Sequence, residues 1–212
     1  MLAVRRFTET VTDLEALVER GSVDAVGAAV LRSLVCHRAN VLVAGPTGSG
    51  KTTLLNVLSK EIPPGERVVS VEDAAELRLG GHVVRLEGRP PNAEGAGGIA
   101  QGDLLKHALR LRPDRIIVGE VRGTEAFHML QAMSTGHEGS MSTIHASSAE
   151  EALWRLETLA LAGDVNVSEA SVSRQVRSAV DAVVVVGRRG GKRVVRTIAE
   201  VDGDLEEVYS CS

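Results

Sequence analysis

The chain has 212 residues, enough to bury the core of one domain, and its 43% hydrophobic and 25% charged residues are ordinary for a soluble globular protein. The aromatic content of 2% argues against recognition of nucleic acid by base stacking, and the net charge of −4 gives no overall attraction to nucleic acid or an anionic membrane. No apolar run approaches the ~18 residues of a membrane span. Cys36 and Cys211 lack metal-ligand spacing, which is typical of a reduced, cytosolic protein.

The beginning of the chain predicts a short strand followed by two helices. Residues 2–7 have the composition of a strand. Thr12, with an acidic residue three positions later, forms a capping box that predicts a helix ending at Gly21. A second helix is expected from Ser22 to about residue 37, because apolar residues recur there at helical spacing.

Residues 45–52 fit the phosphate-binding loop pattern, which is a Gly, four residues and then Gly-Lys-Thr. A predicted buried strand precedes the loop and a helix with an apolar face follows it, which is the context that this motif requires. Such a loop wraps backbone N–H groups around the β-phosphate, and the helix adds its positive end. Lys51 is placed to reach the β- and γ-phosphates, and the Thr52 hydroxyl to bind Mg²⁺. The predicted nucleotide-binding residues are Gly45, Pro46, Thr47, Gly48, Ser49, Gly50, Lys51, Thr52 and Thr53.

The next segment predicts two strands, a loop and a helix. Residues 67–71 form the first strand, which delivers Glu72 at its carboxyl end, and residues 82–86 form the second. Residues 88–102 contain five glycines and a Pro-Pro pair, which predicts an exposed loop. Residues 103–111 are expected to be helical.

A continuous apolar run at residues 115–118 indicates a buried strand, and it ends in a glycine and Glu120. Residues 124–133 predict a helix. Residues 140–144 predict another strand, which ends at His145.

The last part of the chain predicts two helices and three strands. Ser147 or Ser148 caps a helix that runs to about residue 162, and residues 165–180 contain another. The three strands, which have the pattern of antiparallel edges, lie at residues 182–186, 193–201 and 206–210.

Strands that alternate with helices predict an α/β fold with a mostly parallel sheet, helices on both faces and small antiparallel C-terminal strands. Ligands of open α/β sheets bind at the carboxyl ends of the strands. Glu72, Glu120 and His145 each follow a predicted strand, so we expect them to converge with Lys51 on one crevice.

A nucleoside triphosphatase needs a metal ligand and a group that activates water, besides the phosphate loop. Glu120 sits where a metal- or water-coordinating carboxylate belongs, and the alternative is an incidental loop carboxylate. Glu72 or Asp73 is expected to act as a general base or to hold metal-bound water, and the alternative is structural capping of the next turn. Two adjacent carboxylates are tolerable beside Mg²⁺ and costly without it.

Two of the six histidines, His137 and His145, are candidates to sense the γ-phosphate, with a surface position as the equal alternative. No histidine has zinc-ligand spacing. The others are expected to be structural: His37, His82, His107 and His128. Four arginines surround the strand before Glu120, and one or two of them are expected to contact phosphate: Arg110, Arg112, Arg115 and Arg122.

Four segments, in this order, resemble the motifs of the secretion and pilus-assembly motor ATPases of the type II/type IV secretion superfamily. Residues 45–52 resemble the Walker A loop and residues 70–77 the Asp box. Residues 112–123 resemble the Walker B segment, with Glu in place of the usual Asp, and residues 135–146 resemble the His box.

The similarity covers roughly residues 38–160. Residues 86–92 also resemble the tight-adherence (Flp) pilus branch, which is the nearest match within the family. The resemblance implies a RecA-like ATPase core that uses ATP and Mg²⁺. It also implies a homo-oligomer, a hexameric ring, that works with inner-membrane platform proteins of a secretion or pilus system. Such a ring lies in the cytoplasm against the inner face of the cell membrane, and no direct binding of nucleic acid is expected.

The resemblance also assigns roles to site residues. Glu72 would activate water, and Glu120 would be the Mg²⁺-associated glutamate beside Thr52. His145 or His137 would couple the γ-phosphate to domain motion. Two arginines, Arg110 and Arg122, match positions at which the family contacts phosphate.

Family members usually carry a substantial N-terminal domain, whereas about 37 residues precede the first core strand here. We treat residues 1–37 as a remnant or linker and residues 38–212 as the ATPase domain. A fragment, a truncated copy or a partner that supplies the missing half is therefore expected.

The function implied is an Mg²⁺-dependent ATPase that powers pilus assembly or protein secretion. One alternative is a nucleotide-binding subunit that hydrolyses ATP poorly, and the other is a conjugation-type secretion motor.

Overall fold

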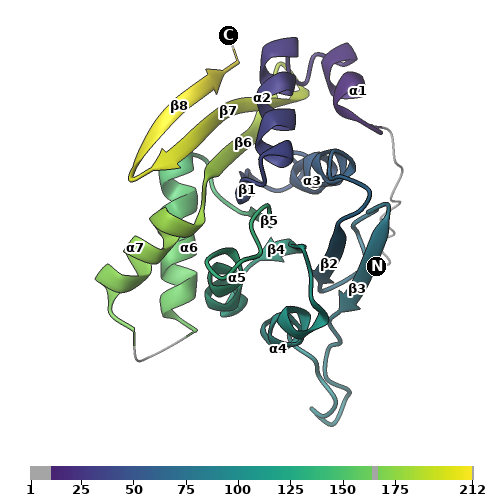
Figure 1. Ribbon diagram of the computed structural model, residues 1–212, viewed down its shortest axis with the longest axis vertical. Coiled ribbons are helices and arrows are strands. Elements are labelled where there is room, and N and C mark those ends of the chain that lie inside the picture. The colour runs from purple at the N-terminus through teal and green to yellow at the C-terminus, as the bar shows by residue number, and fades with distance from the viewer. Residues whose placement is uncertain (1–10, 164–166, 212) are drawn as a thin grey trace.

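The computed structural model describes residues 11–163 and 167–211, and the strand expected at residues 2–7 lies outside this part of the chain. In this part, helices and strands alternate around one sheet (Figure 1). None of the helices in the described ranges has the length and apolar character that crossing a membrane requires.

The elements follow one another in this order: α1 (Leu14–Glu19), α2 (Ala25–Cys36), β1 (Val41–Ala44), α3 (Lys51–Lys60), β2 (Arg67–Glu72), β3 (His82–Glu87), α4 (Gln101–Ala108), the 3₁₀ turn η1 (Leu109–Leu111), β4 (Arg115–Val121), α5 (Glu125–Met133), β5 (Met141–Ile144), α6 (Ala149–Leu161), α7 (Glu169–Ala179), β6 (Ala182–Arg189), β7 (Lys192–Asp202) and β8 (Asp204–Ser210).

The sheet has the strand order β3-β2-β4-β5-β1-β6-β7-β8, and every pair from β3 to β6 is parallel. The predicted α/β class with a mostly parallel sheet is confirmed. The expected three-stranded antiparallel edge is wrong in one respect. β6 pairs in parallel with β1, with Val41 opposite Ala182, so only β7 and β8 are antiparallel additions. β6 is buried along most of its length because it lies inside the sheet.

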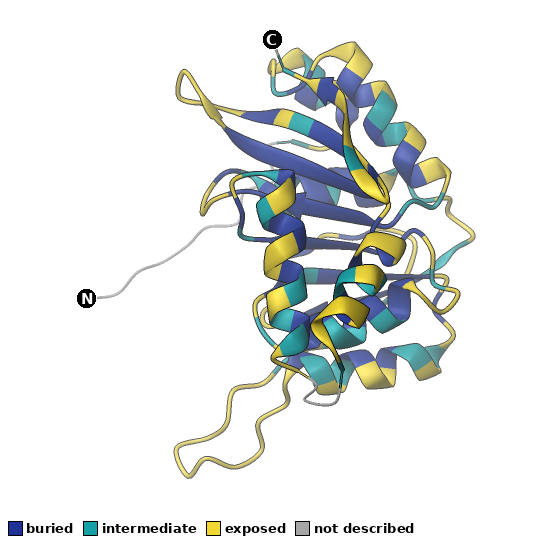
Figure 2. Cartoon of the chain, turned by 90° about the vertical axis from the view of Figure 1, so that its left-hand side faces the viewer, coloured by how far each residue is buried: buried dark blue, intermediate teal, exposed yellow. Residues whose placement is uncertain are grey.

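Helices cover both faces of the sheet, and each face has its own apolar core. α1, α2 and α3 pack on one face, and α4, α5, α6 and α7 pack on the other. In β1, Leu42 and Ala44 enter the second core while Val41 and Val43 enter the first, because successive side chains of a strand point to opposite faces. This explains why inner strands such as β1 and β6 are continuous apolar runs, and Figure 2 shows the inner strands as dark blue ribbons in the middle of the molecule.

The first two helices begin later than predicted, at aspartates. Asp13, not Thr12, caps α1, and Asp24 caps α2; each side chain accepts the backbone N–H three residues on. An aspartate one or two residues further along caps in the same way the first turn of a helix that starts correspondingly later. Ser22, expected to open α2, instead lies in the turn, where its carbonyl accepts the backbone N–H of Val195 in β7.

The glycine-rich loop before α4 is exposed, as predicted, and projects from the body as a long arm (Figure 2). Its two sides are joined by an antiparallel bridge between Arg89 and Ile99. At its tip the Asn92 side chain accepts two backbone N–H groups. α4 then begins at Gln101, two residues earlier than expected.

Arg115 is an entirely buried arginine at the edge where the parallel strands begin, which we call the amino edge. Its guanidinium forms a bidentate pair with Glu66, at 2.5 and 3.0 Å, and donates to the Val35 carbonyl at 2.9 Å. The pair ties the end of α2 to the starts of β2 and β4. Arg115 is therefore structural and does not contact the opposite edge of the sheet, where the predicted site lies.

Gly139→Ala tests the packing around this arginine. Gly139 has a φ of +84°, and an added Cβ would lie 2.6 Å from Arg115 Nη1. Gly136 has a φ of +90° with nothing within 4 Å, so Gly136→Ala carries only the backbone strain. We expect Gly139→Ala to lower the free energy of unfolding by about 1–3 kcal/mol more than Gly136→Ala does, as measured by urea denaturation. Equal losses would contradict the packing role.

Candidate functional site

A cavity of ≈ 440 Å³ opens at the carboxyl ends of the parallel strands. Because β1, β4 and β5 are neighbours and β2 adjoins β4, the segments that follow them meet there. The structure thus brings together Lys51, Glu72, Glu120 and His145, as the sequence predicted. The cavity is lined by Thr47, Gly48, Gly50, Lys51, Thr52, Thr53, Glu72, Asp73, Ala74, Glu76, Gln101, Gly119, Glu120, Arg122, His145 and Arg193.

One wall is the loop between β1 and α3. Gly48 and Gly50 have φ values of +70° and +105°, which glycine adopts readily. Gly45 packs so tightly that an added Cβ would lie 2.6 Å from the Val186 carbonyl oxygen. No side chain caps the first turn of α3, so its N–H groups are available to an anion.

Lys51 lies in the middle of this loop and is buried. Its ammonium donates to the carbonyls of Gly45 at 3.0 Å and Pro46 at 3.4 Å, and it lies 3.7 Å from Glu120 Oε1. Burial lowers the pKa of Lys51, while the Glu120 charge opposes that shift. The ammonium is thus held at the centre of the loop by partners that a phosphate oxygen can replace.

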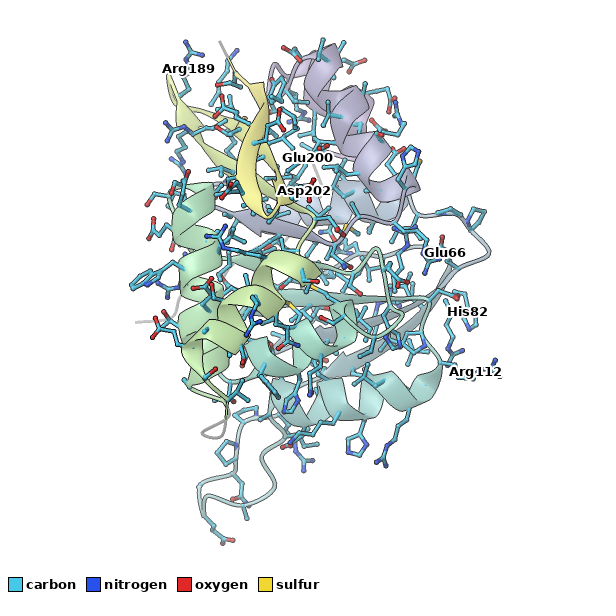
Figure 3. All side chains as sticks on the ribbon, turned by 60° about the vertical axis from the view of Figure 1, so that its left-hand side comes forward. Glu66, His82, Arg112, Arg189, Glu200 and Asp202 are labelled. Carbon is cyan, nitrogen blue, oxygen red and sulfur yellow. The ribbon has the colours of Figure 1, made fainter. Side chains whose placement is uncertain are left out.

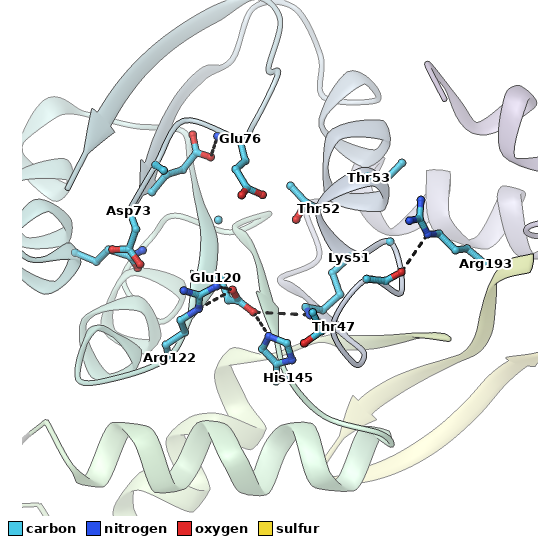
Figure 4. A pocket seen from close by; sticks show the side chains of 16 residues that line it. Thr47, Lys51, Thr52, Thr53, Asp73, Glu76, Glu120, Arg122, His145 and Arg193 are labelled. Carbon is cyan, nitrogen blue, oxygen red and sulfur yellow. Dashed lines mark hydrogen bonds and ion pairs between the residues drawn. The ribbon is translucent and has the colours of Figure 1, made fainter. Parts of the chain in front are cut away.

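Glu120 is the central residue of a cluster of four charged or polar side chains, which we call the Glu120 cluster. Its Oε1 lies 2.7 Å from His145 Nε2, and its Oε2 accepts a hydrogen bond from Arg122 Nε at 2.7 Å. Figure 4 shows Arg122, His145 and Lys51 converging on this carboxylate from three directions. The cluster therefore combines one negative charge with two permanent positive charges and an imidazole.

A β-bulge positions Glu120, which lies inside β4 and not after it. The β4–β5 register shifts between Val118 and Val121, so Gly119 and Glu120 together oppose Thr143. The Thr143 hydroxyl donates to the Gly119 carbonyl at 2.8 Å and so satisfies an acceptor at the irregularity. Bulges bend a strand and redirect side chains, which is how β4 presents Glu120 to the cavity.

Glu72 lines the opposite wall and is almost entirely buried. Its Oε1 accepts the backbone N–H groups of Glu76 at 2.9 Å and Leu77 at 2.7 Å, so it caps the turn after β2. Burial raises the pKa of Glu72, and these two hydrogen bonds oppose the rise. The structural-capping alternative thus describes its contacts, and the same side chain also faces the cavity.

Burial lowers the pKa of His145, and the positive charge of Lys51 lowers it further, while Glu120 raises it. The net direction favours a neutral imidazole near pH 7. If neutral His145 carries its proton on Nε2, which faces the Glu120 carboxylate, its Nδ1 is the nitrogen that can accept a hydrogen bond.

Two predicted site residues lie at the amino edge, away from this cavity. His137 is in the turn before β5, with Nδ1 3.3 Å from the Ala132 carbonyl oxygen, whereas His145 follows the other end of the same strand. Arg110 is in η1, before β4 begins. The prediction that these two side chains contact phosphate within this chain is therefore corrected. Arg112 also lies at this edge, as Figure 3 shows.

Three cavity residues with charged or polar side chains were not predicted as site residues. Glu76 follows β2, and Gln101 begins α4 with a buried Oε1 that has no hydrogen-bond partner among the described residues. Arg193 comes from β7 and donates through Nε to the Gly48 carbonyl at 3.1 Å. The only signal for Arg193 was its place beside a basic, glycine-rich turn, because it is separated from Gly48 by 145 positions.

Metal binding by protein groups alone is not indicated. In residues 11–163 and 167–211, no group of three His, Cys, Asp or Glu side chains is arranged to hold a metal ion. The Thr52 hydroxyl and several carboxylates nevertheless line one cavity, which suits an ion that keeps its waters and takes only one or two protein ligands.

The family model for "Type II/IV secretion system protein" matches residues 1–200. The putative conjugal transfer protein Rv3659c of Mycobacterium tuberculosis is 42% identical over 212 residues, which cover 98% of this chain and 60% of that protein. The type IV secretion system protein PtlH of Bordetella pertussis is 47% identical over 167 residues, which cover 76% of this chain and 49% of that protein. The chain thus spans about half to three fifths of the length of these relatives.

Two solved structures share the fold. The VirB11 ATPase from the Brucella suis type IV secretion system, in complex with sulphate, has a TM-score of 0.75 and 32% identity. The match covers 88% of this chain and 54% of VirB11. The pilus retraction motor PilT with bound ADP has a TM-score of 0.62 and 27% identity, and the match covers 87% of this chain and 51% of PilT.

The titration of His145 tests the Glu120 cluster. Because the Glu120 charge raises the pKa of His145, Glu120→Gln is expected to lower that pKa further. Because the Arg122 charge lowers it, Arg122→Gln is expected to raise it. The measurement is a pH titration of the histidine ring signals by NMR. Shifts of the same sign in both variants would contradict the arrangement.

The pH dependence of stability tests the environment of Glu72. Its raised pKa means that the folded chain binds this proton more tightly than the unfolded chain, so its contribution falls as the pH rises from about 4.5 through the folded-state pKa. Glu72→Gln keeps the acceptor and removes the titration. The free energy of unfolding of the variant, relative to the wild type, is therefore expected to increase with pH over this window. Glu94→Gln, in the exposed loop, is the control. If the difference in the free energy of unfolding between Glu72→Gln and the wild type stays constant over this pH range, the interpretation is refuted.

Proposed function

The chain belongs to the type II/IV secretion system protein family, and from this premise we propose that it binds Mg²⁺-ATP and hydrolyses it as part of a motor that drives pilus assembly or secretion. The observation that carries the proposal is the Glu120 cluster beside the phosphate-binding loop. This cluster supplies cations for a polyphosphate and a carboxylate at the same point. The sulphate complex of VirB11 and the ADP complex of PilT support an anion and nucleotide site in this fold.

The loop holds the phosphates through backbone N–H groups around Gly48 and Gly50 and through the Lys51 ammonium. Lys51 is already aimed at the loop centre by two carbonyls, so little side-chain freedom remains to be lost on binding. The Thr52 hydroxyl would hold Mg²⁺, which would supply positive charge to stabilise the transferred phosphoryl group. Glu120 is engaged by Arg122 and His145, which favours a role through a bound water over direct ligation.

Glu72 is the proposed water activator. A general base works best when its pKa lies near the working pH, and burial shifts the pKa of Glu72 in that direction. Capping by its Oε1 fixes the orientation of the carboxyl group at the cavity wall. Arg122, and not Arg110, is the arginine of this pair that faces the phosphates.

His145 is proposed to couple phosphate occupancy to motion. It connects the end of β5 with the segment that leads into α6, and it touches Glu120. A phosphate that takes Lys51 away from Glu120 changes the charge facing the imidazole. The position of the His145 ring thereby depends on whether phosphate occupies the loop, and a movement of the ring can pass to α6 on the other face of the sheet.

The assembly is proposed from the family resemblance. A closed homo-oligomeric ring, contact with inner-membrane platform proteins and a position at the cytoplasmic face of that membrane belong to the proposal. The tight-adherence branch also stays a prediction. Sizing the protein by light scattering with and without a non-hydrolysable ATP analogue tests the ring.

A conjugation-type motor is the second candidate, and the names of relatives favour it. Rv3659c is called a putative conjugal transfer protein, and TrbB of Rhizobium radiobacter, 36% identical over 215 residues, is called a conjugal transfer protein. The genes next to this one distinguish the two candidates. Relaxase genes there would favour the conjugation-type motor, and pilin genes would favour the pilus-assembly motor.

Lys51→Ala and Glu120→Gln are each expected to lower steady-state ATP turnover by about 10²–10³-fold, the cost of removing one preorganised group that stabilises the transition state. Lys106→Ala and Glu94→Gln, which lie outside the cavity, are the matched controls and should leave turnover unchanged. A loss below tenfold would contradict these roles. Turnover of the wild type no higher than that of Lys51→Ala, with ATP still bound, would instead favour a nucleotide-binding subunit.

A further inference from the structure

Gln101 is the first residue of α4, and it lines the cavity that the phosphate-binding loop also borders. The residue is 6% exposed, and its Oε1 is buried with no hydrogen-bond partner among the described residues. A buried acceptor without a partner costs stability. Gln101 is therefore a candidate for contact with a molecule that enters the cavity.

Backbone contacts hold Gln101 beside the carboxyl end of β2. The Gly88 N–H donates to the Glu72 carbonyl at 2.7 Å, which continues the pairing of β2 with β3. Arg89 then pairs with Ile99 through two backbone hydrogen bonds, of 3.0 and 2.8 Å, so the exposed loop returns to the sheet just before α4. α4 in turn packs against β2 and β3 (Figure 1). Gln101 therefore reaches the cavity on the side where Glu72 lies.

The other polar side chains that this part of the chain contributes to the cavity are acidic. They are Glu72, Asp73 and Glu76, and Figure 4 shows the last two among the side chains that border the cavity. Gln101 is the only carboxamide in the lining of this cavity. It adds an acceptor on this side without adding a further negative charge opposite the phosphates.

An acceptor at this point matches a need of the hydrolysis reaction. The attacking water must be oriented so that a lone pair points at the γ-phosphorus, and two acceptors that take its two hydrogens fix that orientation. Glu72, the proposed water activator, supplies one acceptor, and Gln101 Oε1 can supply the other. The terminal torsion of glutamine is broad, and no described residue holds Oε1 by a hydrogen bond, so the carboxamide can turn toward the water.

We propose that Gln101 is a catalytic residue that orients the attacking water through its Oε1, an inference that rests on the proposed function. The water oxygen forms a bond to the γ-phosphorus, while the bond from that phosphorus to the β–γ bridging oxygen breaks. The electron pair of the broken bond leaves with the nucleoside diphosphate. One proton of the water passes to Glu72 and the other stays on the released phosphate, so Gln101 neither gains nor loses a proton.

Gln101→Leu removes the acceptor and keeps much of the side-chain volume. It is expected to lower kcat for ATP about 10- to 100-fold, because a misplaced reacting group loses that much. The Kd of a non-hydrolysable ATP analogue should change by less than about twofold, because the contact to the water matters in the transition state and not in binding. Gln175→Leu, the same exchange on α7 and outside this cavity, is the matched control and should change neither quantity.

The stability of the nucleotide-free chain separates a catalytic role from a structural one. Because Gln101→Leu removes a buried acceptor without a described partner, its midpoint of urea denaturation is expected to equal or exceed that of the wild type. A glutamine that held the start of α4 in place would give a lower midpoint on substitution.

The pH dependence of turnover supplies a second readout. Gln101→Glu keeps an acceptor and should retain more turnover than Gln101→Leu. Its added charge joins those of Glu76 and Glu87 in raising the pKa of Glu72. Because the base must be ionised, the acidic limb of the pH–rate profile is expected to move to higher pH. Gln175→Glu should leave the profile unchanged.

Turnover of Gln101→Leu equal to that of the wild type, with Lys51→Ala inactive, would overturn this inference and leave the proposed function intact. Weaker binding of the ATP analogue with unchanged binding of ADP would place Gln101 on the γ-phosphate and overturn its contact with the water. A lower urea midpoint with an unmoved pH profile would make its role structural. If the wild type hydrolyses ATP no faster than Lys51→Ala, the proposed function fails and this inference fails with it.

Discussion

The site depends on one partly buried carboxylate, Glu120, which holds three positively charged or polar groups from different parts of the chain. Lys51 comes from the start of α3, Arg122 from the end of β4 and His145 from the end of β5. Attraction between charges is stronger away from water, and an unpaired buried charge is costly, so each group fixes the position of the others. Among these four residues the positive charges of Lys51 and Arg122 outnumber the one negative charge of Glu120, so this side of the cavity still favours a polyanion.

The two edges of the sheet use the same residue types for opposite purposes. At the amino edge, Arg115 and Glu66 form a closed pair whose hydrogen bonds are used up inside the protein, so it holds elements together. At the carboxyl edge, a bulge and the Thr143 hydroxyl accompany the placement of Glu120 at a cavity, which Lys51 and Arg122 also line. The Arg115–Glu66 pair and the Glu120 cluster therefore differ in their access to solvent and not in the chemistry of their side chains.

Most of the helices and strands could be predicted because buried parallel strands are apolar runs and the helices show regular apolar spacing. The errors concern properties that local sequence does not encode. Thr12 and Asp13 are both residue types that cap helices, and the structure uses Asp13. The direction of β6 depends on its partner β1, about 140 residues away. His137 and His145 flank one strand, and only the parallel arrangement decides which of them reaches the cavity. The bulge at Glu120 and the approach of Arg193 likewise require the folded sheet.

The arginines of the β6–β7 hairpin bear on where this domain ends. All four recognisable motifs lie before residue 147, and a fragment that stops soon after them keeps all four. Such a fragment lacks the inner strand β6, which pairs with β1, and both guanidinium donors to the Gly48 carbonyl. The contacts that shape the phosphate-binding loop therefore extend as far as β7. In that sense, strands β6 and β7 belong to the same functional module as the motif that begins at Gly45.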